Sequence, residues 1–448
     1  MSNFIGQQAV VVGAGMGGLT AARALADHFE RVLVLERDVL PGDPEDRAGI
    51  PQGRHVHALL GGGQRALGDL FPGFEDDLAR AGAVPLRVGL DIRTERPGYD
   101  PFPQRDLGWV AYAMSRPQVE LTVRRRVEAC PTIELRQRCR VQELVPRADR
   151  AAVSGVRYAD GDGKTQTVNV GLVVDASGRG TLTLGFLGSI GRALPDETTI
   201  GVDVGYATAV FAIPDNAPGD WKGVFSFPQA GRSSRGALLL PLEGNRWIVT
   251  VAGRHGDNPP GDEAGFMAYA QRLRTLTVYN AIEHAKRLGE IARFGFPASV
   301  CRHYERLADF PRGLLPLGDG VCRFNPVYGQ GMSVAAQEAR ALGRLLERRA
   351  AAPDPLDGLA PAFFAEASAL IETPWASAAI PDFVHPQTRG ERPANLEQML
   401  KIGLAMGKLA ARDPAVHKLM AEVQHLLKPR SVYQDPELVQ RVLAVMAE

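Results

Sequence analysis

The sequence predicts an α/β protein with a two-domain α+β organisation and a helical C-terminal region, and three observations support this fold class. Residues 9–36 follow the order strand, glycine turn, helix, strand. Residues 201–251 carry short apolar runs that predict a second sheet. After Pro355 the apolar residues recur at helical spacing. We expect a first domain in two parts (1–190 and 301–352), a sheet-rich second domain (191–300) and a helical region (353–448).

The glycine turn predicts a Rossmann-like dinucleotide-binding unit. Gly13 permits the tight turn, Gly15 lets a pyrophosphate approach the backbone, and Gly18 lets the helix pack closely on the strand. The helix N-terminus then offers unpaired N–H groups to the phosphates. Glu36 ends the second strand at the spacing expected of an acid that binds a ribose diol. A glycine-rich turn without a nucleotide is the weaker interpretation.

The charge balance and the cysteines indicate the cellular setting. Acidic and basic residues number 51 each, so the formal net charge is zero and a nucleic-acid partner is not expected. The four cysteines show no metal or disulfide spacing, which suits a reducing compartment. The first strand follows Met1 closely, and no window holds the ~18 apolar residues of a membrane span. We expect a cytoplasmic protein without a transmembrane segment.

A long loop over the first domain is predicted after Glu36, where prolines and glycines are dense. It leads to Arg54, His55 and His57. The two histidines are spaced as metal ligands on a strand could be, but no third ligand is near, so we expect no metal site. We expect instead that this loop reaches a cofactor or closes over a site.

The rest of the first domain predicts helices and then an antiparallel insertion. Ser115 is a suitable N-cap and Pro117 suits the first helical turn. An Asp-Gly-Asp-Gly turn at residues 160–163 predicts a hairpin. The expected elements are short helices over 64–70 and 75–81, a helix from Ser115 to Val127, an antiparallel meander over about 133–170, and a buried strand over 172–175.

The second half of the chain predicts the second sheet and the C-terminal helices. The last helices are amphipathic, which suits packing on the core or on a partner subunit, and a membrane-surface helix is the alternative. The expected elements are strands over 201–213, 223–227, 237–242 and 246–251, a helical cover over 263–288, an extended return over 294–304, and a buried strand over 313–317.

A second glycine-containing signature follows that last strand. Gly318-Asp319 ends the strand, Pro326 follows, and Gly329 and Gly331 open a helix. In this order, after the first glycine motif, these residues make the chain resemble the class A FAD-dependent monooxygenases of the para-hydroxybenzoate hydroxylase and squalene epoxidase type. The resemblance covers most of residues 7–350.

The resemblance implies FAD as cofactor and gives several residues a role. The acid matching Asp319 binds the ribityl chain, the position of Pro326 lies beside the isoalloxazine, and N–H groups at the following helix start stabilise negative charge on the ring. Arg116 looks like the family's cofactor-contacting arginine. Together the two motifs and the resemblance assign cofactor binding to Gly13, Gly15, Gly18, Glu36, Arg37, Arg54, Arg116, Asp175, Gly318, Asp319, Pro326, Gly329, Gln330, Gly331 and Met332.

Three segments look more narrowly like the bacterial epoxidases of polyether polyketide assembly. They are residues 52–60, 175–179 and 302–332, and Trp375 and Asp382 also stand where such proteins keep these residue types. One departure concerns the motif at Asp175, in which residues 181–184 replace the usual Ser and final Arg. Because that motif helps bind pyrophosphate and NAD(P)H, the choice between NADH, NADPH and a separate reductase stays open.

The activity that the resemblance implies is monooxygenation. NAD(P)H reduces FAD, O2 forms a flavin C4a-hydroperoxide, and the substrate receives one oxygen. We expect epoxidation of a polyketide-like or terpenoid alkene in secondary metabolism, with aromatic hydroxylation as the alternative. A phenol would need a base, for which His55, His57 and Tyr206 are candidates, and none is assigned as catalytic.

Other activities stay open beside oxygenation. A prenyl reductase that saturates C=C bonds shares the Asp-x-Ser-Gly-Arg pattern at Asp175. A flavin halogenase would need a Trp-x-Trp-x-Ile-Pro segment, which the four tryptophans do not form. A flavin-binding protein without catalysis is a further alternative. The expected partners are O2 and a small hydrophobic or aromatic substrate, and a homodimer or a carrier-protein contact is left open.

Overall fold

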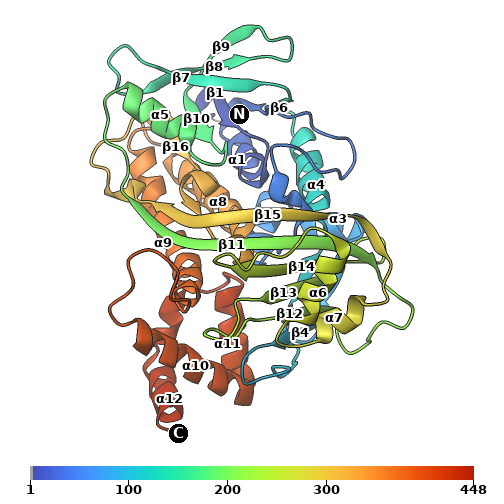
Figure 1. Ribbon diagram of the computed structural model, residues 1–448. Helices are drawn as coiled ribbons and strands as arrows, with labels where there is room; N and C mark the ends of the chain where they lie inside the picture. The colour runs from blue at the N-terminus through green and yellow to red at the C-terminus, as the bar shows by residue number, and fades with distance from the viewer. Residues whose placement is uncertain (1–3) are drawn as a thin grey trace.

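The computed structural model describes residues 4–448 and combines two large sheets, two small ones and several helices (Figure 1). A parallel sheet and its covering helices form the upper part of the view. Two long strands of a second sheet cross the middle, and the rest of that sheet and the C-terminal helices form the lower part. The predicted α/β fold with a helical C-terminal region is confirmed.

The five-stranded sheet contains the predicted glycine turn at its carboxyl edge. Its strands are parallel, and the central ones end in buried apolar runs at residues 9–12, 32–35 and 172–174, as strands covered on both faces do. Val12 pairs with both Asp175 and Leu35, and Asp175 pairs with Pro316, so the loops after these strands meet at one edge. In spatial order the strands are β16 (Leu314–Pro316), β10 (Leu172–Asp175), β1 (Gly6–Val12), β2 (Phe29–Leu35) and β6 (Ile133–Arg136).

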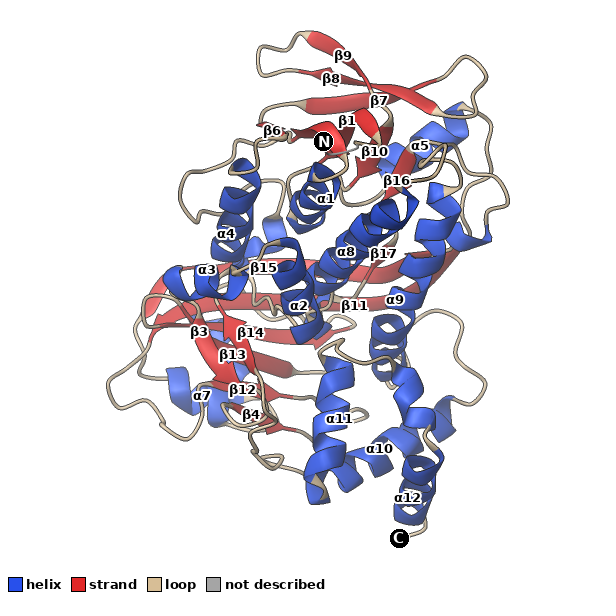
Figure 2. Ribbon diagram, turned by 180° about the vertical axis from the view of Figure 1, so that it is seen from behind, coloured by secondary structure: helices blue, strands red, loops and turns tan. Residues whose placement is uncertain are grey.

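Helices cover one face of this sheet, as the reverse view shows (Figure 2). The long helix α8 packs against α1 closely enough that a Cβ on Gly343 would lie 3.5 Å from Ala24. Ser115 caps α4 as predicted, because its side chain accepts a hydrogen bond from the Gln118 N–H. The helices of this group are α1 (Met16–Ala26), α2 (Gly61–Leu70), α3 (Phe74–Arg80), α4 (Arg116–Glu128), α8 (Gly331–Arg349) and α9 (Leu359–Asp382).

The antiparallel insertion is shorter than predicted. Residues 133–136 form β6, which extends the parallel sheet beside β2, so the expectation that the meander begins at 133 was wrong. A break at residues 137–139 separates the two, and an alternating run alone does not reveal which neighbour a strand will choose. The meander consists of β7 (Arg140–Pro146), β8 (Val153–Ala159) and β9 (Thr165–Asn169), and α5 (Thr181–Ser189) follows β10.

The second sheet has seven strands, and two of them come from outside the predicted second domain, one before it and one after it in the sequence. Its edge strands β4 and β17 lie outside residues 191–300, and both pair with strands inside that range. Helices α6 (Glu263–Gln271) and α7 (Thr277–Ile282) pack on one face. The order is β17 (Cys322–Arg323), β15 (Arg287–Arg302), β11 (Glu197–Ala212), β14 (Arg246–Arg254), β13 (Gly236–Leu242), β12 (Gly223–Ser226) and β4 (Ile92–Glu95); β3 (Val84–Arg87) and β5 (Val110–Ala113) form a separate pair.

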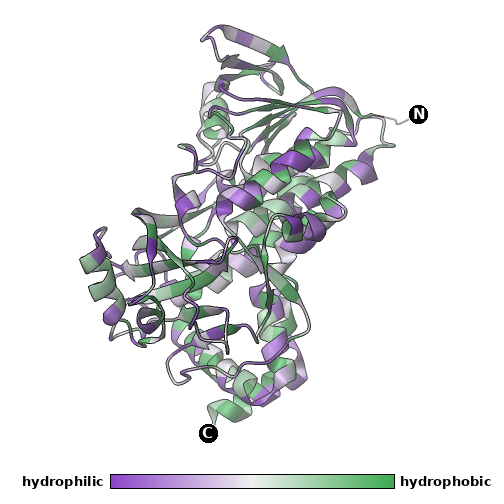
Figure 3. Ribbon diagram, turned by 90° about the vertical axis from the view of Figure 1, so that its right-hand side faces the viewer, coloured by the Kyte–Doolittle hydropathy of each residue, from purple (hydrophilic) through white to green (hydrophobic). Residues whose placement is uncertain are grey.

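The last three helices pack on a hydrophobic cluster of their own, which includes Phe102 from the loop after β4. Figure 3 shows hydrophobic segments on both these helices and the second sheet. Among residues 4–448 we find no helix whose length and hydropathy would suit a bilayer crossing. These helices are α10 (Leu396–Arg412), α11 (Pro414–Gln424) and α12 (Pro436–Met446).

Candidate active site

A cavity of about 2270 Å³ runs from the carboxyl edge of the parallel sheet to the C-terminal helices. Its walls come from the loops after β1, β2 and β10, from β11, β13 and β14, and from α9, α10 and α11. Typical ligand pockets measure roughly 300–1,000 Å³, so this volume accommodates more than one small molecule.

The glycine turn forms one end of the cavity. Gly13 has φ +96°, a conformation that favours glycine. A Cβ on Gly18 would lie 1.8 Å from the Gly13 carbonyl oxygen, so only glycine allows this contact between helix and turn. Gly15 faces open space, with no atom within 4 Å of a Cβ built there. The turn therefore leaves room at Gly15 and none at Gly18.

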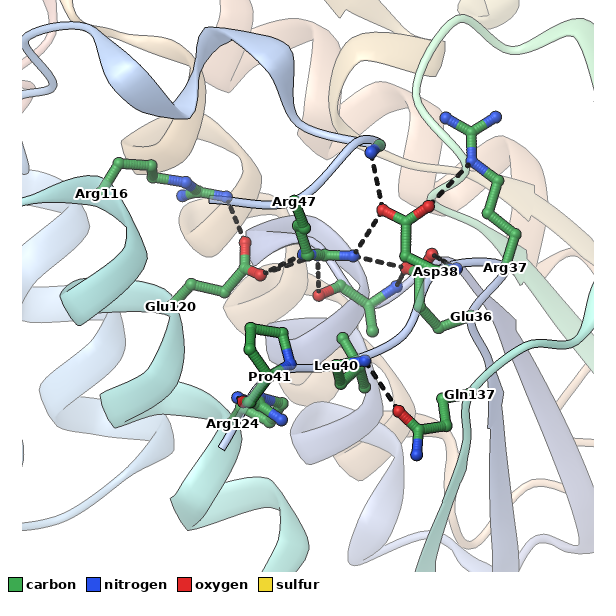
Figure 4. A network of polar contacts seen from close by, with 12 residues as sticks. Glu36, Arg37, Asp38, Leu40, Pro41, Arg47, Arg116, Glu120, Arg124 and Gln137 are labelled. Carbon is green, nitrogen blue, oxygen red and sulfur yellow. Dashed lines mark hydrogen bonds and ion pairs between the residues drawn. The ribbon is translucent and has the colours of Figure 1, made fainter. Parts of the chain in front are cut away.

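Glu36 belongs to a buried ionic network beside this turn (Figure 4). Its carboxylate accepts a hydrogen bond of 2.7 Å from the Ala14 N–H and pairs with Arg47 at 3.2 Å. Arg47 also pairs with Glu120 at 2.7 Å and donates to the Ala14 carbonyl at 2.8 Å. Arg37 lines the cavity with an exposed side chain that reaches Asp38. The sequence does not reveal Arg47, because its acidic partners Glu36, Asp38 and Glu120 come together only in the fold.

Arg116 lies between this network and the middle of the cavity. Its guanidinium pairs with Glu120 at 2.8 Å and contacts the sulfur of Met332. Burial lowers the pKa of Arg116, while Glu120 opposes that change. The Nε atom is buried and has no hydrogen-bond partner in residues 4–448. One donor of this arginine is thus left for a ligand.

Gly318 and Asp319 bring a carboxylate to the cavity wall. Gly318 has φ +69°, and its N–H donates a hydrogen bond of 2.7 Å to the buried Glu338. The Asp319 carboxylate lines the cavity and accepts no hydrogen bond from residues 4–448. Its surroundings raise its pKa by desolvation, against Arg323 and Arg116, which lower it. A hydroxyl-bearing ligand would satisfy this carboxylate.

The segment before α8 lines the middle of the cavity. Asn325 caps the short turn that contains Pro326, and Gly329 has φ +66°. Gln330 is 4% exposed, and its side-chain oxygen has no partner in the described chain. Gly331 begins α8, so the unpaired N–H groups of that 19-residue helix start at the cavity.

Besides Gly18, which packs against Gly13, two further predicted cofactor residues do not line the cavity. Asp175 is 1% exposed and accepts hydrogen bonds from the N–H and hydroxyl groups of Ser177 and Thr183, which fixes the loop between β10 and α5. Arg54 has a 59% exposed side chain that pairs with Asp46 at 3.2 Å. The structure thus gives both residues protein partners away from the cavity.

The three candidate bases lie on the cavity wall formed by the second sheet and the loop before α2. The His55 ring shares a hydrogen bond of 2.7 Å with Thr208 through Nδ1, and packs edge-on against Tyr206 at 4.8 Å. Its buried Nε2 has no partner within residues 4–448. The Nδ1 atom of His57 lies 2.9 Å from the carbonyl oxygen of His55. The ring positions of both histidines are thus fixed by contacts within the protein.

Asp382, at the end of α9, joins the C-terminal region to this site. It is 1% exposed, pairs with Arg254 at 2.7 Å, and accepts a hydrogen bond of 3.0 Å from the side-chain amide of Asn325. Tyr328 donates a further hydrogen bond of 2.8 Å to it. The sequence indicates Asp382 by resemblance alone, because nothing local to α9 predicts these three partners.

The sequence matches the family described as FAD binding domain over residues 7–354. The chain belongs to this FAD-binding family. Protein Rv3254 of Mycobacterium tuberculosis is 35% identical over 351 residues, which cover 76% of this chain and 73% of that protein. Squalene monooxygenase 1,1 of Brassica napus is 24% identical over 343 residues, which cover 75% of this chain and 62% of that protein.

Solved structures of flavoproteins share the fold. The p-nitrophenol 4-monooxygenase PnpA from Pseudomonas putida DLL-E4 matches with a TM-score of 0.66 at 19% identity, over 95% of this chain and 99% of that chain. The flavin-dependent brominase Bmp2 also matches with a TM-score of 0.66, at 15% identity, over 93% of this chain and 94% of that chain. The family match shows an FAD-binding protein, and the similarity to a squalene monooxygenase is consistent with the class A FAD-dependent monooxygenases, a class that uses NAD(P)H as reductant.

Proposed function

We propose that FAD occupies the part of the cavity between the glycine turn and the start of α8. The space in front of Gly15 suits a pyrophosphate. The free carboxylate of Asp319 suits the hydroxyls of a ribityl chain. The unpartnered Arg116 Nε and Gln330 Oε1 suit the polar edges of the cofactor, so the residues present fit FAD. Gly18 would shape the turn by packing against Gly13. The residues that would hold the cofactor are Gly13, Gly15, Glu36, Arg37, Arg116, Gly318, Asp319, Pro326, Gly329, Gln330, Gly331 and Met332.

We infer that the rest of the cavity receives an alkene of the polyketide or terpenoid type, which the enzyme epoxidises. Bound FAD, once reduced by NAD(P)H, activates O2 and supplies one electrophilic oxygen atom, the other leaving as water. The protein's part is to orient the alkene and keep bulk water away. Apolar side chains such as Leu240, Phe294 and Phe296 line the sheet side of this space, and Met399 and Leu400 line the helical side.

The observation that carries this proposal is that no histidine on the cavity wall, as residues 4–448 form it, keeps a pKa suited to deprotonating a phenol. Burial lowers the pKa of His55 to about 4 and that of His57 to about 3, and Arg54 and Arg116 respectively add to the effect. Burial also raises the pKa of Tyr206, which keeps its hydroxyl protonated. The other histidines of the cavity wall have pKa values lowered to about 4, and these are His385, His417 and His425.

Epoxidation suits such a wall better than aromatic hydroxylation does. A phenol with a pKa of about 10 is activated by a base whose own pKa lies near the working pH. Imidazoles with a pKa of about 4 remove such a proton poorly. Electrophilic oxygen transfer to a C=C bond needs no proton abstraction, and an apolar wall binds the alkene without desolvating a charge.

The test is oxygen-isotope incorporation by purified holoenzyme. The protein is supplied with NADH or NADPH, labelled O2, and either farnesol or simple phenols, and products are analysed by mass spectrometry. We expect one labelled oxygen in an epoxide of farnesol, and no product when the nicotinamide is omitted. Labelled hydroxylation of a phenol alone would instead identify an aromatic hydroxylase. A farnesol product two hydrogens heavier and without label would identify a C=C reductase.

A further inference from the structure

An arginine without an ion-pair partner among residues 4–448 lies at the end of the cavity formed by the second sheet and α11. Arg96 follows β4, and two backbone hydrogen bonds with Tyr99, of 2.9 and 2.8 Å, fix its loop. The neighbouring Phe102 contacts the His417 ring of α11 at 5.0 Å between ring centroids. Arg96, Phe102 and His417 all line the cavity. This end is thus built from the sheet edge and the C-terminal helices together.

The guanidinium of Arg96 is positioned by aromatic rings rather than by an acid. It stands 4.5 Å from the centroid of the buried Phe102 ring and 5.8 Å from that of Phe227. No carboxylate of residues 4–448 lies within 4.0 Å of it, and its buried Nε makes no hydrogen bond there. Cation–π contacts orient this group but do not neutralise its charge.

The nearby acids are already occupied by other partners. Glu95 pairs with Arg93 at 2.8 Å and accepts hydrogen bonds from Thr275 and Thr277. Asp100 pairs with Arg274. A small rotation of side chains therefore cannot supply Arg96 with a counter-charge without breaking another ion pair.

Arg254 provides the comparison within the same space. It also lines the cavity, but Asp382 neutralises it at 2.7 Å. A half-buried guanidinium without such a partner loses hydration and gains no ion pair in return, which is unfavourable unless a ligand supplies the anion. His417 presents a second unsatisfied atom, since its Nδ1 is buried without a hydrogen-bond partner in the described chain.

We propose that Arg96 binds a carboxylate at one end of the otherwise apolar substrate, with His417 lining the same pocket. This assignment rests on the proposed function, because it names the class of alkene that the cavity receives. The planar fork of one guanidinium matches the two oxygens of a carboxylate. A single cation held against two phenylalanine rings suits one negative charge rather than the several of a diphosphate. The carboxylate end then fixes which C=C bond of the chain reaches the other end of the substrate space.

The experiment compares three ligands of one carbon skeleton on the FAD-loaded protein. Farnesoic acid carries the carboxylate, methyl farnesoate is its neutral match, and farnesyl diphosphate is its phosphate match. Dissociation constants come from calorimetry, with flavin absorbance as a second signal. Arg96→Met keeps the length and apolar stem of the side chain, and Arg96→Lys keeps its charge. Arg232→Met is the control, since Arg232 is an exposed arginine beside the cavity wall.

We expect farnesoate to bind wild type more tightly than its ester, and Arg96→Met to weaken farnesoate by roughly 10- to 100-fold. Binding of the ester should change by less than about twofold. Arg96→Lys should recover part of the loss, and Arg232→Met should leave all three constants unchanged. An equal loss for acid and ester, or none for either, would overturn the proposal.

Two further outcomes separate this assignment from the proposed function. Tighter binding of the diphosphate than of farnesoate, dependent on Arg96, would overturn the carboxylate. In a second outcome, neither farnesoate nor its ester perturbs the flavin, but Arg96→Met still weakens the binding of small carboxylates such as benzoate. The alkene substrate would then be wrong, and the carboxylate site at Arg96 would be supported. If both acid and ester bind equally well with and without Arg96, the proposed alkene binding is supported and the proposed carboxylate site at Arg96 is wrong.

Discussion

Tyr328 donates a hydrogen bond of 2.8 Å to Asp382 across 54 residues of sequence, and so connects the segment before α8 with the last turn of α9. Asp382 is also the ionic partner of Arg254. One carboxylate therefore holds together the second sheet, the segment at the centre of the cavity and the C-terminal region.

Replacing the Asp382 carboxylate should destabilise the folded protein. We expect Asp382→Ala to lower the free energy of unfolding by about 3–5 kcal/mol, because it leaves Arg254 buried without its counter-charge. Urea titration of the holoprotein measures this. Asp357→Ala, at an exposed aspartate before α9, should change stability by less than about 0.5 kcal/mol. Equal stability of the two variants would contradict the structural role of Asp382.

Two glycines of the first motif, Gly15 and Gly18, should respond differently to replacement by alanine. Gly18→Ala would bring a Cβ to 1.8 Å from the Gly13 carbonyl, so we expect little folded protein. Gly15 has φ −78° and open space before it, so Gly15→Ala should fold normally and bind FAD at least about tenfold more weakly. Circular dichroism and FAD titration of the apoprotein distinguish the effects. Undiminished FAD binding by Gly15→Ala would place the pyrophosphate elsewhere.

Replacing Asp319 should mainly weaken FAD binding, whereas replacing Glu36 should mainly destabilise the apoprotein. Asp319 accepts no hydrogen bond within the described chain, so Asp319→Ala should leave the apoprotein stable and weaken FAD by roughly 10- to 100-fold. Glu36→Ala removes the partner of Arg47 and of the Ala14 N–H, and should destabilise the apoprotein by about 1–3 kcal/mol. Thermal unfolding without FAD and fluorescence titration with FAD supply the two numbers. Asp162→Ala, in an exposed turn, is the control. A destabilised Asp319→Ala apoprotein would point to a structural role instead.

Glu338 should make stability depend on pH. Burial raises the pKa of this carboxyl from 4.5 to about 8, Asp319 adds to the rise, and the Gly318 N–H opposes it. The folded state thus holds a proton that the unfolded state has released, so this contribution is fully present below pH 4.5 and is lost as the pH rises through about 8.

Glu338→Gln, which mimics the protonated side chain, should remove that dependence. It keeps an acceptor for the Gly318 N–H, so we expect the variant to gain stability relative to wild type as the pH rises from about 5 to 8. Urea midpoints at several pH values measure the difference, with Glu372→Gln on the exposed side of α9 as control. A parallel pH profile of variant and wild type would rule out a raised pKa at Glu338.

Local patterns predicted the elements around the glycine turn correctly. The apolar run at residues 9–12 can be satisfied only inside a sheet covered on both faces, and it forms β1 at the sheet's centre. The Ser115 cap depends on neighbours within one helical turn, and so the sequence contains all of it. Predictions based on short-range geometry therefore held.

Features that depend on tertiary pairing were beyond the sequence. Strands β4 and β17 join the second sheet from distant segments, and the hydrophobic periodicity of a strand does not predict which strand it will pair with. The same holds for Arg47, whose loop position gives no sign that Glu36 and Glu120 converge on it. Arg54 was assigned to the cofactor by its place in a motif, whereas its side chain lies at the surface.

The separate hydrophobic cluster beneath α10, α11 and α12 has a consequence for how this enzyme could diversify. Met406, Val416 and Val442 stabilise the C-terminal helices through one another, while the parallel sheet rests on different residues. Mutations on the cavity-facing side of α10 and α11 should therefore affect mainly the stability of these helices and leave the packing of the parallel sheet unchanged. Substitutions in these helices could change ligand preference during evolution, while the nucleotide-binding end of the cavity keeps its sequence.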